Sequence, residues 1–272
     1  MVSKTLVLLG ALVAAVSAVP RCKPATTGSA GAPVPTLPAT GGATELPPPA
    51  ASLSLKRIAA GHGIQNYTCA SSDQAKAAAT GALAVLYDIT SLYPGTPNTG
   101  LSAEAFNALP TTILWTQPLP LNLQDPSAAS AGTPSDPNNA LAESSYGAVI
   151  GDPFPNPAAD LVLGGLAPIA YLGHHYFDAA GAPTFDLRAA GDGLFGRVAK
   201  ADGVAAPPAS DGGVLGTGAV DWLRLVDDGT GAGEGVTAVY RVITAGGQAE
   251  PCSQSGAGSG SVPYTAMYWF YG

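Results

Sequence analysis

The C-terminal third of the chain holds the stretch that decides the fold. Residues 236–244 read VTAVYRVIT and residues 264–271 read YTAMYWFY, with Gly246 and Gly247 between them. Both segments are rich in β-branched and aromatic residues, which favour strands. The two glycines are typical of a turn. We therefore expect a closing β element that ends in an aromatic terminal strand.

Further strand patterns precede this element. Short apolar runs that fit strands are separated mostly by glycine-rich turns. These runs are residues 53–58, 64–69, 169–177, 184–188, 194–200 and 220–226. Residues 59–63 would separate the first two. Short strands with little helix predict an all-β fold, a mostly antiparallel β-sandwich or barrel with a short helical and loop insertion.

Two segments carry helical signals. Residues 74–93 are rich in alanine, with Leu83, Leu86 and Tyr87 at helical spacing, and are the best helix candidate. Residues 102–109 predict a second, short helix capped by Ser102. The proline-rich segment that follows predicts a long loop packed over the β core.

The N-terminus predicts secretion. Lys4 and a short apolar core over residues 6–16 precede small residues at 16–18, so residues 1–18 read as a signal peptide. That core is too short to span a bilayer, which needs about 20 residues. Residues 19–51 read as a disordered leader rich in Pro, Ala and Thr, and residues 52–272 as one β-rich domain with a loop-rich insertion at about 94–160. We expect a secreted protein, extracellular or in the cell wall, with no membrane insertion.

Composition narrows the classes of partner. The chain has 11 Lys and Arg against 19 Asp and Glu, a formal net charge of −8, and 46% hydrophobic residues. This balance supports a sizeable core and argues against nucleic acid, since phosphate binding needs clustered basic residues.

Three cysteines, Cys22, Cys69 and Cys252, allow three disulfide pairings in an oxidising compartment. We favour Cys69 with Cys252, which would tie an early strand to the end of the chain and leave Cys22 free or paired between molecules. Asn66 begins the glycosylation motif Asn-Tyr-Thr, which predicts a surface position. Strand alternation then turns Tyr67 and Cys69 inward, together with Gln65, which would need hydrogen-bond partners.

Several of these motifs, taken in order, resemble a known family. They are residues 61–69 (GHGIQNYTC), 173–177 (GHHYF), 183–185 (PTF), 221–225 (DWLRL) and 239–247 (VYRVITAGG), then Cys252 and the terminal aromatic strand. This order is similar to that of a secreted fungal and bacterial family catalogued as domain of unknown function 3455, over about residues 53–272. The resemblance implies a secreted β-rich domain with no established activity.

Fungal members of that family often carry a malate dehydrogenase label, which this sequence does not support. A dinucleotide site needs Gly-x-Gly-x-x-Gly between a strand and a helix. Gly229, Gly231, Gly233 and Gly235 alternate strictly and precede a strand, so they predict a loop. We expect no cofactor.

The histidines are the sharpest candidates for chemistry. If residues 169–177 form a strand, His174 and His175 face opposite sides, with His175 beside Tyr171 and Phe177. A zinc or copper site built from His62, one of this pair and a carboxylate is conceivable. The alternative, a structural histidine beside aromatics, is favoured, and we expect no metal.

Carboxylates near strand ends could form a hydrolase pair. The candidates are Asp178, Asp186, Asp192 and Asp221. Arg241, a lone charge in an apolar strand, should pair with an acidic residue such as Asp221, because a buried charge needs a partner.

The terminal strand suggests a binding surface. Trp269, Tyr264 and Tyr268 could stack on sugar rings if one face of the strand is exposed; the alternative is that both faces are buried. The leading hypothesis is an extracellular binding or interaction protein for cell-wall polysaccharide or a host surface. The alternatives are a secreted hydrolase or metal-dependent enzyme centred on His175, and a structural wall protein. A pocket joining His175 to a carboxylate and a second polar group would favour an enzyme.

Overall fold

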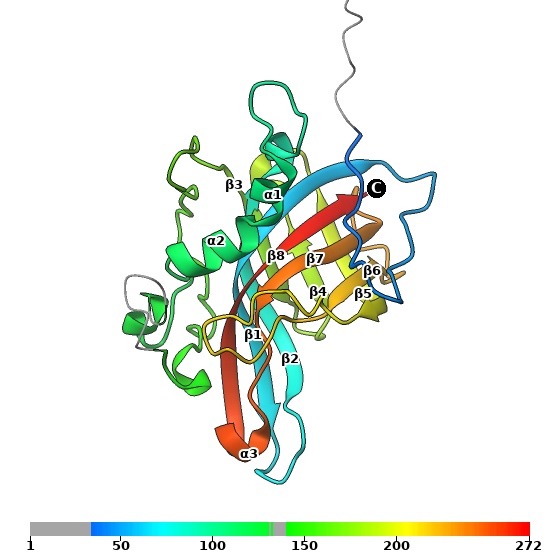
Figure 1. The fold of residues 1–272 in the computed structure, drawn as a ribbon. Helices are drawn as coiled ribbons and strands as arrows, with labels where there is room; N and C mark the ends of the chain where they lie inside the picture. Colours follow the sequence, from blue (N-terminus) through cyan, green and yellow to red (C-terminus); the bar gives the residue numbers. More distant parts are fainter. Residues whose placement is uncertain (1–33, 131, 133–139) are drawn as a thin grey trace, which may run out of the picture. The chain divides into compact units, whose positions relative to one another are not determined.

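The terminal strand closes a sheet into a barrel. In the computed structural model, which describes residues 34–130, 132 and 140–272, each strand pairs antiparallel with the next, and the last strand pairs with the first (Figure 1). The strands are β1 (Leu55–Cys69), β2 (Ala78–Asp88), β3 (Tyr171–Phe177), β4 (Pro183–Asp186), β5 (Phe195–Val204), β6 (Trp222–Asp227), β7 (Ala238–Gly246) and β8 (Gly258–Tyr271). The predicted all-β fold is confirmed, and the structure selects the barrel over the sandwich.

β1 is one continuous strand, so the predicted break at residues 59–63 is wrong. The glycines there serve close packing. A Cβ at Gly61 would lie 2.6 Å from the ring of Tyr268, and one at Gly63 would lie 1.9 Å from the carbonyl oxygen of Leu83. Glycine is required at Gly63 because no side chain fits that close to a neighbouring backbone.

The helix predicted over residues 74–93 is also wrong, because β2 occupies most of that segment. Ala82, Ala84 and Leu86 belong to the cluster inside the barrel, whereas Val85 and Tyr87 belong to the cluster outside it. This alternation has the period of a strand. Pairing with β1 and β3 outweighs the helix propensity of the alanines, since propensity is a weak prior against tertiary context.

The two longest α-helices among the described residues lie in the insertion. α1 (Ala103–Asn107) confirms the short helix predicted at 102–109, with Ser102 as its cap, 3.1 Å from the backbone nitrogen of Ala105. α2 (Leu109–Thr116) was not predicted; it packs against β1, β7 and β8 (Figure 1). The remaining helical pieces are η1 (Thr90–Leu92), η2 (Pro126–Ser130), η3 (Glu143–Ser145), η4 (Arg188–Ala190) and α3 (Cys252–Ser255).

The barrel wall separates two apolar clusters. The inner cluster holds Leu86, Phe185 and Phe270. The outer cluster joins Trp269 on β8 to Phe106 of α1. Around β8 the wall is therefore covered on its outer side by the insertion, and every residue from Val262 to Phe270 is buried.

The N-terminal segment contacts the domain. Residues 34–51 contain no helix or strand, but Tyr240 donates a hydrogen bond to the carbonyl of Pro47 (2.9 Å), and Thr36 donates to the hydroxyl of Tyr93 (3.0 Å). These contacts tie parts of residues 34–51 to the domain, and the leader predicted over residues 19–51 stays a prediction. The predicted signal peptide and Cys22 lie outside the described residues. Within the described parts of the chain, no helix is long and apolar enough to cross a membrane.

The predicted disulfide between Cys69 and Cys252 is confirmed. It joins the end of β1 to α3, which are separated by 183 residues in the sequence. Because it closes such a long loop, it restricts the unfolded chain strongly.

We predict that a Cys69→Ser, Cys252→Ser double variant loses about 2–5 kcal/mol of unfolding free energy, the usual cost of removing a native disulfide. Urea unfolding followed by circular dichroism measures this. Wild type treated with reductant is the matched comparison. Equal stability of oxidised and reduced protein would contradict the prediction.

A second prediction concerns β1. Gly63→Ala should destabilise the protein by at least about 1–3 kcal/mol, because the methyl group meets a backbone carbonyl that can move only with its strand. Gly164→Ala is the control, since nothing lies within 4 Å of the added methyl group there. Thermal unfolding of both variants tests the difference, and similar midpoints would show that β1 tolerates a side chain.

Candidate functional site

One end of the barrel interior is a cavity of about 1230 Å³. The inner apolar cluster fills the barrel around Phe270 and Leu86, whereas the cavity begins at Tyr268 and extends past Gln65 and Tyr67. Its walls combine apolar and polar side chains. Among those lining it are Ala82, Phe177, Val198, Val220, Leu223 and Leu225. A barrel of this strand number has room for one small ligand where side chains leave its interior open.

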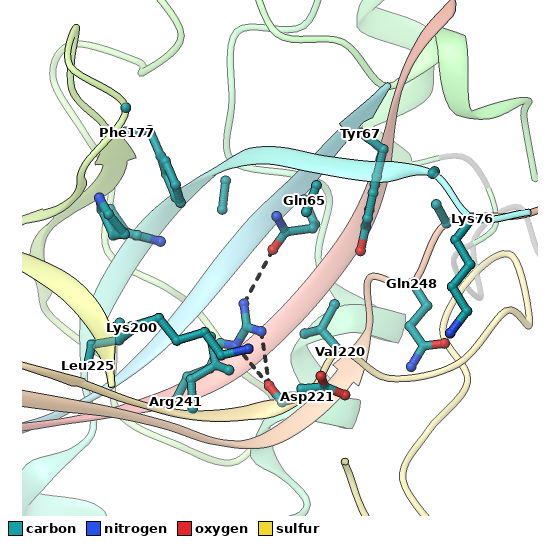
Figure 2. A pocket seen from close by; sticks show the side chains of 18 of the residues that line it. Gln65, Tyr67, Lys76, Phe177, Lys200, Val220, Asp221, Leu225, Arg241 and Gln248 are labelled. Atoms are coloured by element: carbon teal, nitrogen blue, oxygen red, sulfur yellow. Dashed lines mark hydrogen bonds between the residues drawn. The ribbon is translucent and has the colours of Figure 1, made fainter. Parts of the chain in front are cut away.

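Arg241 lies on this cavity (Figure 2). It belongs to β7 and is the cross-strand partner of Tyr268. Its Nε and Nη2 donate to the main-chain carbonyl of Asp221, at 3.1 and 2.9 Å, and its Nη1 donates to Oε1 of Gln65 at 3.3 Å. The predicted charge pair with Asp221 is therefore wrong in its chemistry, because the backbone oxygen accepts in place of the carboxylate.

The prediction that Gln65 points inward and needs hydrogen-bond partners is confirmed. Its Nε2 donates to the carbonyl of Gly81 (2.5 Å) while its Oε1 accepts from Arg241. Tyr67, on the same face of β1, donates to the carbonyl of Gly247 (2.7 Å), and burial raises its pKa to about 12. These contacts hold both side chains at the cavity wall.

The other arginines of the described chain are all paired with carboxylates. The pairs are Arg57 with Asp88 and Asp192, Arg188 with Asp186, Arg197 with Asp178 and Asp228, and Arg224 with Asp202. Among the described residues, no carboxylate oxygen lies within 4.0 Å of the Arg241 guanidinium. Its neutral acceptors orient the guanidinium without neutralising it.

These ion pairs also bear on the proposed hydrolase carboxylates. Asp178, Asp186 and Asp192 each bind an arginine, and side-chain hydrogen bonds from Arg197 and Arg188 hold the pKa values of Asp178 and Asp186 below the usual range. These three are engaged in separate ion pairs. Of the four candidates, Asp221 lines the cavity.

His175 points into the barrel. It is 4% exposed, its ring stacks on Phe185 with centroids 4.1 Å apart, and it lines the cavity. Its Nδ1 lies 2.9 Å from the carbonyl oxygen of Thr184. A carbonyl only accepts, so Nδ1 carries the proton and the neutral ring has its lone pair on Nε2. Burial lowers the pKa of His175 to about 4.

His174 faces the other side of β3, as predicted. Its ring stacks on Phe154 with centroids 3.9 Å apart, and its Nε2 lies 3.0 Å from the hydroxyl of Tyr171. Tyr171 was predicted on the face of His175 instead. The pairing of β2 with β3 shifts register between Leu86 and Tyr87, and this irregularity reverses the alternation before Gly173.

His62 lies on the outer face of β1, where its Nδ1 is 2.9 Å from the hydroxyl of Thr265 and 3.3 Å from the carbonyl of Tyr264. It lines a smaller pocket, of about 210 Å³, separate from the large cavity. The three histidines thus lie in three different environments. Within the described ranges, no group of three or more His, Cys, Asp or Glu residues could hold a metal ion.

The aromatic residues of β8 are buried on both faces. Trp269, Tyr264 and Tyr268 are each 0% exposed, so the exposed aromatic face needed for stacking on surface sugars is absent from β8. Trp269 packs outward against Tyr93, with ring centroids 5.8 Å apart. Tyr264 and Tyr268 point inward with hydroxyls 2.8 Å apart, and Tyr268 lines the cavity. Closure of the barrel gives this strand a partner on each edge and a packed layer on each face.

Asn66 is half-buried in β1, and its Oδ1 accepts a hydrogen bond from Ser261. Its glycosylation stays a prediction. Lys200 at the cavity was not predicted; it follows the inward Val198 by two residues in β5, and Figure 2 shows it extending into the cavity. A single charge two positions after a buried apolar residue in a strand is the signal that could have identified it.

The comparison with protein families agrees with the motifs quoted above. A family model described as Protein of unknown function (DUF3455) matches residues 49–272. The chain belongs to this family. The search of the curated proteins and the search of the solved structures found no match to this chain.

The buried histidines predict a pH dependence of stability. His62 and His175 both have pKa values lowered from 6.5 to about 4, with burial as the main cause. Between about pH 4 and pH 6.5, both histidines are protonated in the unfolded chain but neutral in the folded chain. Stability should therefore be full above about pH 6.5 and fall as the pH drops toward 4, by at most about 1.4 kcal/mol per pH unit for each histidine.

His175→Asn should flatten this dependence, since asparagine can still donate to Thr184 but does not titrate. His174→Asn is the control, because the pKa of the half-buried His174 is lowered less markedly. Urea unfolding at a series of pH values measures both. A wild-type stability that is level across this range would contradict the assignment.

Proposed function

We propose that this protein is an extracellular binding protein that holds one small amphipathic organic molecule, with an anionic group, inside its barrel. The observation that carries the proposal is Arg241, a cation without a carboxylate partner among the described residues, on a cavity of about 1230 Å³ whose walls mix apolar and polar side chains. Extracellular location rests on the signal predicted at residues 1–18 and is part of the proposal.

The size and lining of the cavity favour a small molecule. Ligand pockets typically measure roughly 300–1000 Å³ and combine apolar walls with a few fixed polar groups. Here the walls include Phe177, Val198 and Leu225, and the polar groups are anchored by hydrogen bonds to backbone carbonyls. A site already held in place loses little conformational entropy when a ligand enters.

The charge arrangement favours an anion. Arg241 keeps its guanidinium in one orientation through Asp221 and Gln65, and Lys200 lines the same cavity. Lys76 adds a third cation, and three carboxylates line the cavity too, Asp221, Asp228 and Glu250, of which Asp228 is bound to Arg197. A carboxylate or sulfonate would give Arg241 the charge-assisted hydrogen bonds that it lacks.

The other expected functions fit less well. Polysaccharide binding through exposed Trp269 or Tyr264 lacks its surface, since both are fully buried. A purely structural wall protein needs no anchored polar groups around a cavity of this size. Binding therefore remains the leading function, with the site moved from the surface of β8 to the barrel interior.

The test uses two dyes with the same aromatic body. Anilinonaphthalene sulfonate carries an anionic group and phenylnaphthylamine does not. Wild type should bind the sulfonate more tightly, and Arg241→Gln should weaken sulfonate binding by about tenfold, or 1.4 kcal/mol, while leaving the neutral dye unchanged. Fluorescence titration gives both dissociation constants.

Arg224→Gln is the matched control. Arg224 is the neighbour of two cavity residues on β6, yet its own side chain pairs with Asp202. It should leave both affinities unchanged, and circular dichroism should show all three proteins folded. Sulfonate binding that is equal in wild type and Arg241→Gln would overturn the proposal.

A second candidate function is a proton-transfer enzyme centred on His175. The cavity joins His175 to Asp221, Glu250 and Gln65, the combination that the sequence argument associated with an enzyme. The observation that favours it is the neutral ring with a lone pair on Nε2, the form of histidine that accepts a proton. Binding ranks first because the hydrogen bond of His175 goes to the Thr184 carbonyl, and within the described residues none joins it to a carboxylate or a nucleophile.

The enzyme hypothesis predicts isotope exchange. Carbonyl-bearing carboxylic acids that bind the protein should take up deuterium from heavy water with wild type and not with His175→Asn, as seen by mass spectrometry. His174→Asn should exchange like wild type. Acids that bind without exchange would reject the enzyme and leave binding intact.

A further inference from the structure

His175 offers the cavity a hydrogen-bond acceptor that the protein does not use. Donation from Nδ1 to the carbonyl of Thr184 leaves Nε2 as the unprotonated nitrogen. No partner of Nε2 is found among the described residues. The side chain as a whole is only 4% exposed, but Nε2 is not among the buried atoms that lack a partner, so it faces the cavity. A ligand that displaces water from Nε2 keeps its affinity when it supplies a donor in place of that water.

His175, which carries the acceptor, and Arg241, which carries the charge, both neighbour Tyr268 on the inner wall of the barrel. The ring of His175 is 5.6 Å from the ring of Tyr268, centroid to centroid. Tyr268 in turn is the cross-strand partner of Arg241. Tyr268 is thus a neighbour of both polar groups, and acids with one or two aromatic rings are the bodies to compare as bridges between them.

The surface between the two groups is apolar and aromatic. Phe177 lines the cavity with its ring 5.9 Å from that of His175, and Tyr268 presents its ring beside Arg241. Such walls favour a flat apolar body through burial and aromatic packing. The polar ends and the apolar middle therefore belong to one recognition surface.

We infer that the ligand is a hydroxylated apolar carboxylic acid, most simply a hydroxyaryl acid, whose carboxylate binds Arg241 and whose hydroxyl donates to Nε2 of His175. This inference rests on the proposed function, since it names the chemical class of the molecule in the same cavity. Two-point recognition makes the hydroxyl a specificity determinant, because an acid without it displaces water from Nε2 and offers no donor in return.

The test compares acids with and without a hydroxyl at three lengths. The pairs are benzoate and para-hydroxybenzoate, cinnamate and para-hydroxycinnamate, and naphthoate and hydroxynaphthoate. In wild type, the hydroxyl should tighten binding by about tenfold in at least one pair. The methoxy analogue of that acid should lose the gain, because an ether oxygen cannot donate. Isothermal titration calorimetry measures each affinity.

Variants separate the two contacts. His175→Asn should abolish the hydroxyl gain while the parent acid binds as in wild type, because the shorter side chain can keep the bond to Thr184 without presenting Nε2. Arg241→Gln should weaken both members of the pair equally. His174→Asn, on the outer face, should behave as wild type, and thermal unfolding should show each variant folded.

The outcomes separate a failure of the inferred ligand class from a failure of the proposed function. If the parent acids bind through Arg241 but no hydroxyl improves affinity, or if the gain survives in His175→Asn, the ligand class is wrong and the proposed function stands. If neither these acids nor the anionic dye binds in an Arg241-dependent way, the proposed function itself fails.

Discussion

The pairing of β8 with both β7 and β1 is the constraint on which the rest of the structure depends. It removes the free edges of the sheet and fixes an inside and an outside for every residue of the barrel. Bulky aromatic residues on β8 then demand small neighbours on the same inner face. Gly61 meets the ring of Tyr268, and Ala82 and Ala84 continue the small surface on β2.

The same constraint explains why the cavity is polar at its wall. A barrel filled from one end by Phe185 and Phe270 leaves the other end open, and side chains there face a space that the inner cluster does not reach. Backbone carbonyls satisfy part of their hydrogen-bonding capacity, as Thr184 does for His175 and Asp221 does for Arg241. Arg241 keeps its charge without a carboxylate partner among the described residues, and Nε2 of His175 keeps its lone pair toward the cavity.

The sequence predicted the elements whose local signals agree with the barrel. The strands from β3 to β8 are apolar, β-branched or aromatic, and the loop of alternating glycines before β7 lies where it was expected. The predictions for β1 and β2 failed because their small residues resemble other local structures. The glycines of β1, which leave space for Tyr268 and Leu83, resemble a turn, and the alanines of β2 resemble a helix. Packing between strands distant in sequence decided those positions.

Only part of the candidate site could be predicted from the sequence. Alternation placed Gln65 inward and put His174 and His175 on opposite faces of their strand, but it did not say which of the two histidines points inward. Arg241 was recognised as an unusual charge, but the rule that a buried charge finds a countercharge named the wrong partner, because main-chain oxygens can orient a guanidinium without neutralising it. Which atoms of a partner accept is a property of the folded backbone.

The uncompensated cation also connects stability to binding. Arg241 has no carboxylate within 4.0 Å among the described residues, and its guanidinium is oriented by neutral acceptors. The disulfide and the closed sheet hold this site together despite the unfilled volume. An anion that pairs with Arg241 only in the folded chain would stabilise the barrel in proportion to the logarithm of ligand concentration. Arg241 would therefore link ligand binding to the stability of the fold.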